Sequence, residues 1–134
     1  MECIFCRIIR REFGEIIYEN GSFVVLMDIG PLSRGHMLVV PKYHGETLED
    51  IPDEYLSGAL VLIKKIVGKI GTITKYNVLQ NNGHIQSVPH VHFHIVPYNE
   101  EEGEGLKIQW ERVSISKEEI ATIGESYKKL LEKI

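Results

Sequence analysis

The sequence has little that would place this chain in a membrane or in an oxidising compartment. No apolar run approaches the ~18 residues needed to span a bilayer, and Arg7, Arg10 and Arg11 interrupt the N-terminal apolar residues where a secretory signal would need its hydrophobic stretch. Only two cysteines are present, Cys3 and Cys6. A structural disulfide is therefore not expected, and we predict a cytoplasmic or nuclear protein.

Positive charge is also scarce, since 15 Lys and Arg residues stand against 19 Asp and Glu residues, for a net charge of −4. No basic cluster is long enough to follow a phosphate backbone, which argues against nucleic acid as a partner. The 134 residues, 43% of them hydrophobic, suffice for one core. No repeat or linker divides them, and the acidic stretch at residues 99–105 is most simply a solvated loop, so we expect a single domain over residues 1–134.

Short apolar runs rich in β-branched and aromatic residues predict β-strands, and the pair Asn20-Gly21 between the first two predicts a hairpin. Pro41 should end the third run because proline cannot donate to a ladder. The predicted strands are residues 16–19, 23–27, 36–40, 76–80 and 91–96.

Two further segments have apolar residues at helical spacing. The first runs from Pro52, a residue suited to a first helical turn, to Ile70, with Gly71 placed to end it. The second follows Ser116 and Glu119, whose spacing indicates a capping box, and should pack on the sheet or on a partner. Because strands and helices do not alternate as βαβ units do, the pattern favours an α+β fold with an antiparallel sheet.

The most unusual feature is a row of three histidines, His90, His92 and His94, that alternate with apolar residues from just before the last predicted strand into it. Side chains in a strand alternate faces, so all three imidazoles should leave one face. One histidine there would usually be a half-exposed residue of no consequence, but three in register argue for chemistry. The outer two Cα atoms should lie about 13 Å apart, too far for all three side chains to share one ion easily, which favours different roles.

A polar loop that includes Asn81, Gly83, Gln86 and Ser87 precedes these histidines and offers amide and hydroxyl donors for a phosphate oxygen. Beside a row of imidazoles, such a loop suggests phosphoryl or nucleotidyl transfer. Residues 86–96 resemble the His-x-His-x-His signature of the histidine-triad (HIT) family. The likeness extends over most of the chain.

The other matching segments are residues 3–9, 28–29 and 35–44, and Trp110 is similar to a late aromatic residue of members with a C-terminal extension. Within the family, the chain is most similar to the Hint-like adenosine-5′-monophosphoramidase branch and less similar to the dinucleotide-cleaving Fhit type. The resemblance implies a HIT-like fold, with a five-stranded antiparallel sheet, a long helix between strands three and four, and a C-terminal helix.

The resemblance also implies a mechanism. His92 would be the nucleophile and form a covalent nucleotidyl-histidine intermediate, with one ring nitrogen donating to the carbonyl of His90. His94 and Ser87 would contact the phosphate oxygens or the leaving group. Asp28 would accept hydrogen bonds from the ribose hydroxyls, although a lone Asp after a strand is otherwise a turn residue. The predicted substrate-binding set is Phe5, Ile8, Leu26, Asp28, Ile29, Asn81, Gln86 and Val88.

The Cys-x-x-Cys pair opens the chain instead of following a strand, as a thioredoxin-type redox pair would. In members with this pair, the resemblance implies a zinc ion held by Cys3, Cys6, His44 and His90. Two thiolates and two imidazoles make a closed tetrahedral site with a structural role. The alternative is two metal-free thiols with His44 on the surface. No organic cofactor is expected.

We therefore predict a homodimeric hydrolase that cleaves nucleoside 5′-monophosphoramidates or nucleotidyl esters of AMP or GMP. A non-catalytic nucleotide-binding adaptor is the main alternative. A third hypothesis is a metallohydrolase that uses His90 and His92 as an i, i+2 ligand pair. The loop between Gly83 and Pro89 is shorter than in relatives, and His84 within it most simply faces solvent.

Overall fold

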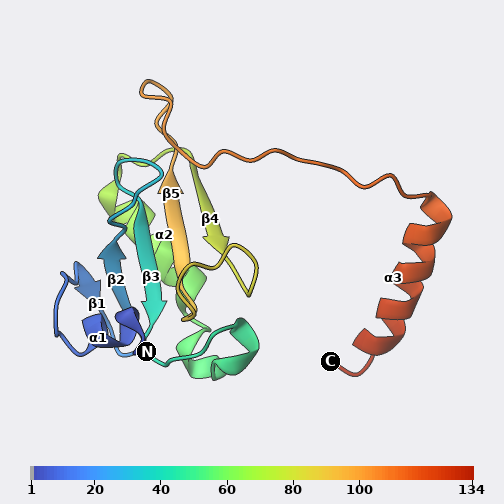
Figure 1. Ribbon diagram of the computed structural model, residues 1–134, viewed down its shortest axis with the longest axis horizontal. Helices are drawn as coiled ribbons and strands as arrows, with labels where there is room; N and C mark the ends of the chain where they lie inside the picture. Colours follow the sequence, from blue (N-terminus) through green and yellow to red (C-terminus); the bar gives the residue numbers. More distant parts are fainter. Residues whose placement is uncertain (1) are drawn as a thin grey trace.

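The computed structural model describes residues 2–134 and contains one sheet flanked by helices (Figure 1). The strands are β1 (Tyr18–Glu19), β2 (Phe23–Met27), β3 (Met37–Pro41), β4 (Tyr76–Gln80) and β5 (Phe93–Pro97). They pair antiparallel throughout, in the order β1-β2-β3-β5-β4. The α-helices are α1 (Ile4–Ile9), α2 (Ala59–Ile70) and α3 (Lys117–Leu131). The predicted α+β fold is confirmed.

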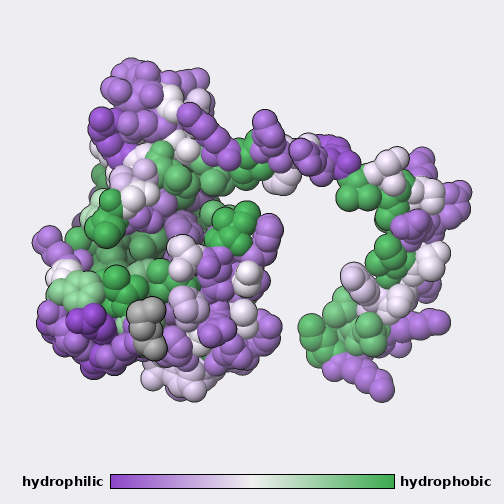
Figure 2. Space-filling model, in the orientation of Figure 1, coloured by the Kyte–Doolittle hydropathy of each residue, from purple (hydrophilic) through white to green (hydrophobic). Residues whose placement is uncertain are grey.

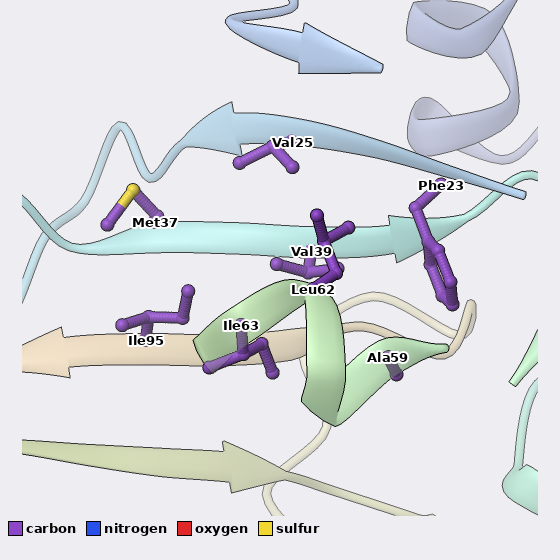
Figure 3. Close-up of a cluster of buried hydrophobic side chains, with 8 residues drawn as sticks. All are labelled: Phe23, Val25, Met37, Val39, Ala59, Leu62, Ile63 and Ile95. Carbon is purple, nitrogen blue, oxygen red and sulfur yellow. The ribbon is translucent and has the colours of Figure 1, made fainter. Parts of the chain in front are cut away.

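Alternating strand residues build a core on each face of the sheet. On one face, Ala59, Leu62 and Ile63 of α2 pack against strand residues (Figure 3), which are Phe23, Val25, Met37, Val39 and Ile95. On the other face, Phe5 of the short helix α1 packs with Val24, Leu26, Leu38 and Val40. The period-2 alternation of β2 and β3 therefore leaves one face for α2 and the other for α1 and the histidines.

The predicted helix from Pro52 begins later than expected. Residues before α2 form two 3₁₀ turns, Leu48–Asp50 and Asp53–Tyr55, and α2 itself begins at Ala59. Gly58 precedes α2 at φ −92° and ψ 0°, and glycine is the weakest helix former in this window apart from the proline. The predicted end is confirmed, because Gly71 adopts φ 79° and its N–H bonds to the carbonyl of Val67.

The last strand is also shorter than predicted, since His90, Val91 and His92 precede β5. Pro89 lacks an N–H, the N–H of His90 donates to the carbonyl of Val88, and the N–H of Val91 donates to Gly45. These bonds replace ladder pairing and curve the chain before Phe93. Strand β3 is shifted by one residue from the predicted range 36–40. It begins at Met37 and includes Pro41 as its last residue.

The chain leaves the sheet through residues 99–105, which are tied down more firmly than a solvated loop would be. Asn99 and Glu104 exchange backbone hydrogen bonds, the N–H of Gly105 donates to Leu32, and Glu104 pairs with Arg34. The remaining residues, 107–134, are all exposed.

Helix α3 begins as predicted, with the Ser116 hydroxyl accepting from the N–H of Glu119, but it stands apart from the sheet (Figure 1). The expectation that α3 packs on its own sheet is therefore wrong. Packing on a partner, and the prediction of one domain over residues 1–134, stay predictions. Among residues 2–134, no helix has both the length and the apolar character that a membrane crossing requires.

Candidate functional site

The three histidines lie together on the α1 face of the sheet, as their alternation predicts. His90 and His92 are buried against the ring of Phe5, at centroid distances of 5.8 and 5.0 Å. The rings of His92 and His94 are 4.9 Å apart. Between them, Val91 is buried, and Phe93 and Ile95 belong to the core under α2.

The tautomer of His92 follows from a single contact. Its Nδ1 lies 2.7 Å from the carbonyl oxygen of His90, which only accepts hydrogen bonds, so Nδ1 carries the proton. Burial lowers the pKa of His92 below its ordinary value of 6.5, and the ring is therefore neutral at pH 7. Its Nε2 keeps a lone pair, as a nucleophile requires.

A fourth histidine, His36, determines the tautomer of His94, and the sequence reading missed it. The N–H of Leu32 donates to Nδ1 of His36 at 3.0 Å, so the proton of the neutral ring sits on Nε2. That Nε2 lies 2.9 Å from Nδ1 of His94, which must accept. His94 therefore carries its own proton on Nε2. Burial, with the neighbouring His92 and His36, lowers the pKa of His94 to about 4, so it donates as a neutral imidazole.

Strand register was the signal that could have found His36. Leu38 of β3 pairs with His94 of β5, and His36 lies two residues before Leu38, on the same face. The side chain is buried, and burial lowers its pKa.

Asp28, His36 and His94 also converge closely enough to suggest a metal site. The hydrogen bonds argue against one, because a metal on Nε2 of His36 would require the proton on Nδ1, where the N–H of Leu32 already points. The cluster is therefore a hydrogen-bonded chain. Asp28 uses Oδ1 to accept from the N–H of Gly30 at 2.8 Å, the expected turn contact, while Oδ2 lies 3.5 Å from His36.

A pocket of about 300 Å³ opens beside these groups. Nine of the predicted site residues line it: Phe5, Ile8, Leu26, Asp28, Ile29, Ser87, Val88, His92 and His94. Ile29 is 99% exposed and contributes only to the rim. Phe13 and Leu38 also line the pocket and were not predicted.

Two predicted contact residues do not reach this pocket. The amide nitrogen of Asn81 donates to the carbonyl of Ile85, and Gln86 accepts from Gly83 and donates to Glu46. Both side chains therefore shape the loop. His84 is exposed, as expected.

Cys3, Cys6, His44 and His90 form a second cluster next to the histidine row. Sγ of Cys3 lies 3.3 Å from Nδ1 of His90, Sγ of Cys6 lies 3.4 Å from Nδ1 of His44, and the two Nδ1 atoms are 3.1 Å apart. Ligands of one tetrahedral zinc ion lie roughly 3.3–3.8 Å apart. The set therefore fits zinc after small adjustments.

The hydrogen bond of His90 supports the same fit. Its Nε2 lies 2.8 Å from the carbonyl oxygen of Pro41 and so carries the proton, which leaves the Nδ1 lone pair facing the thiols. Burial, with the hydrogen bond and charge of Cys3, raises the pKa of Cys6 to about 11. Two adjacent thiolates therefore need a cation between them. Within residues 2–134, no cluster of metal-binding side chains joins His90 to His92, as a metallohydrolase using that pair would require.

Comparisons with known proteins agree with this arrangement. The HIT domain model matches residues 11–101. The chain belongs to the HIT family. It is 44% identical over 128 residues to an adenosine 5′-monophosphoramidase of Schizosaccharomyces pombe, covering 93% of this chain and 95% of that one. A Saccharomyces cerevisiae protein of the same description is 41% identical, with 98% and 82% covered.

A solved structure extends the similarity to the whole backbone. The crystal structure of a histidine triad nucleotide-binding protein from Candida albicans superposes with a TM-score of 0.87 at 37% identity. The match covers 98% of this HIT chain and 99% of the other. The HIT-like fold implied by the histidine row is thereby confirmed.

Proposed function

We propose that this HIT protein hydrolyses nucleoside 5′-monophosphoramidates, or nucleotidyl esters, through a nucleotidyl-His92 intermediate. The observation that carries the proposal is the state of His92, a neutral ring at the pocket whose Nδ1–H donates to the carbonyl of His90 and whose Nε2 keeps its lone pair. The S. pombe and S. cerevisiae relatives are adenosine 5′-monophosphoramidases, which supports AMP conjugates as the substrate class. Guanosine conjugates are the natural second set to test.

In the proposed reaction, Nε2 of His92 attacks the α-phosphorus, and the bond from phosphorus to the leaving nitrogen or oxygen breaks. Negative charge builds on the phosphate oxygens during this step. The Nε2–H of His94 and the hydroxyl of Ser87, both at the pocket, are the donors placed to stabilise that charge or to meet the leaving group. Water then attacks the same phosphorus and loses one proton, which balances the proton that the leaving nitrogen or oxygen takes up in the first step, and His92 leaves as a neutral imidazole with release of the nucleotide.

Electrospray mass measurement of the intact protein tests this function directly. Rapid acid quenching during turnover of adenosine 5′-monophosphoramidate should reveal a species heavier by one adenylyl group, located on His92 by peptide mapping. Tight nucleotide binding without this species and without AMP release would favour the adaptor reading instead.

Asp28 provides a test of nucleotide binding. Asp28→Asn keeps an oxygen for the Gly30 turn contact but removes the charge offered to the ribose hydroxyls. Because charge-assisted hydrogen bonds exceed neutral ones by roughly 1–1.5 kcal/mol, we expect KM to rise about tenfold with little change in kcat. Steady-state kinetics measure both, and unchanged thermal stability would show that the turn survives. An unaltered KM would assign Asp28 to the turn alone.

We further propose that Cys3, Cys6, His44 and His90 hold a structural zinc ion, which would tie α1 to the segments that follow β3 and precede β5. A closed site with four protein ligands leaves no position for substrate. Free thiolate ligands persist in a reducing compartment, which is consistent with the cytoplasm or nucleus.

The homodimer is proposed from the free edge of the sheet. In the part of the chain that the structure describes, β4 is an edge strand with no strand paired on its outer side, and its residues Tyr76 and Val78 are each 40% exposed. Pairing of β4 with β4 of a second copy would continue one antiparallel sheet through both subunits.

A further inference from the structure

The C-terminal arm, residues 106–134, carries an apolar surface that none of residues 2–105 covers. Six residues at helical spacing in and beyond α3 form a stripe: Ile120, Ile123, Tyr127, Leu130, Leu131 and Ile134. All six are more than 40% exposed. Figure 2 shows the hydrophobic residues of α3 on the side that faces the sheet across an open gap. A helix of this kind needs a surface to pack on.

A second uncovered apolar surface lies at the opposite edge of the molecule. We define it as the α2–β1 groove, a cavity of about 630 Å³ lined by Ile17, Tyr18, Leu62, Ile66 and Ile70, with Lys65 and Lys69 beside them. Ile17, Tyr18 and Ile70 are each nearly half exposed. No side chain of residues 2–134 therefore fills the groove.

These two surfaces cannot meet within the subunit as it stands. The strand order places β1 and β4 at opposite edges, and α3 lies beyond the β4 edge (Figure 1). If a second copy joins at β4, the shared sheet continues through the five strands of that copy and ends at its β1. At a strand spacing near 4.8 Å, this β1 lies about 24 Å from β4 of the first copy. The eleven residues between Gly105 and α3 can span about 36 Å when extended, so the arm reaches that far.

The displaced arm is shared with the Candida albicans structure. Residues 2–105 are just over three quarters of the chain, and each superposed residue adds at most an equal share to a TM-score. A TM-score of 0.87 therefore requires part of the arm to superpose as well.

We infer that α3 of each subunit seats its apolar stripe in the α2–β1 groove of a second copy of this chain, as an exchanged arm. The exchange rests on the homodimer in the proposed function but not on its chemistry. With an exchanged arm, each subunit would contact its partner at two separate places, the β4 edge and the α2–β1 groove.

Two co-expressed variants, each with one added cysteine, test the exchange, one with Ile123→Cys in the stripe and the other with Lys69→Cys at the groove. Mild oxidation should join them into a covalent heterodimer. The matched control replaces Ile123→Cys by Lys129→Cys on the polar face of α3, and should give several-fold less product. Each single variant alone measures background from Cys3 and Cys6.

Equal yields of covalent heterodimer with Ile123→Cys and with Lys129→Cys, or no heterodimer with either variant, would overturn the exchange. So would a disulfide that forms only when both cysteines are in one chain, because the arm would then fold back on its own groove. Tyr127→Cys paired with Lys65→Cys repeats the test in case Ile123→Cys disturbs packing. Phosphoramidase activity of every variant is measured separately, so a failed cross-link leaves the proposed reaction untouched.

Discussion

Replacing His92 with alanine is expected to lower kcat/KM for adenosine 5′-monophosphoramidate by about 10⁴-fold or more. Among the imidazoles that line the pocket in residues 2–134, the ring of His92 alone presents a lone pair there, since its Nδ1–H is committed to the carbonyl of His90 and Nε2 remains. No other described histidine at the pocket can take over, because His94 presents an N–H there. Binding of AMP should persist, because the apolar wall and Asp28 remain.

The measurements are AMP release under single-turnover conditions and AMP affinity by calorimetry. His84→Ala is the matched control, because that histidine is exposed in the adjoining loop and should leave both quantities unchanged. Turnover by His92→Ala at the wild-type rate would remove the basis of the proposed reaction. Loss of binding together with turnover would instead indicate a damaged pocket.

Replacing Cys6 with alanine is expected to abolish stoichiometric zinc binding and to destabilise the fold. The site joins α1 to His44 and His90, and Phe5 of α1 also forms the wall against which His90 and His92 pack. Loss of a structural metal costs on the order of 3–5 kcal/mol, which corresponds to a fall in Tm of roughly 10 °C or more. Metal analysis of the purified protein and thermal unfolding measure the two effects.

A strong chelator provides the control for Cys6→Ala. It should lower the Tm of the wild-type protein to that of the variant and leave the variant itself unchanged. The metallohydrolase reading makes the opposite prediction, in which chelation stops turnover while the Tm stays the same. Equal Tm values for the two proteins, with no zinc in either, would show that the thiols are metal-free.

The sequence by itself determined the strands, the α+β class and the shared face of the histidine row. These depend on local properties, namely the period-2 alternation around His92, the turn residues Asn20-Gly21 and the glycine at Gly71. Where a local signal was overridden, the cause was a specific backbone contact. The bonds of His90 and Val91 outside the ladder delayed β5, although residues 91–96 have strand character.

Only the tertiary structure decided which nitrogen of each histidine carries a proton. Those protons depend on the carbonyls of Pro41 and His90 and on the N–H of Leu32. The carbonyl of Pro41 is distant in sequence from the ring of His90, and the proton of His94 depends on His36, which belongs to another part of the chain. The contact between His36 and His94 revealed His36 as a site residue, and a separate bond to the carbonyl of Glu46 turns Gln86 away from the pocket. The place of α3 also required the structure, because an amphipathic stripe shows that a helix needs a partner surface but carries no information on which surface that is.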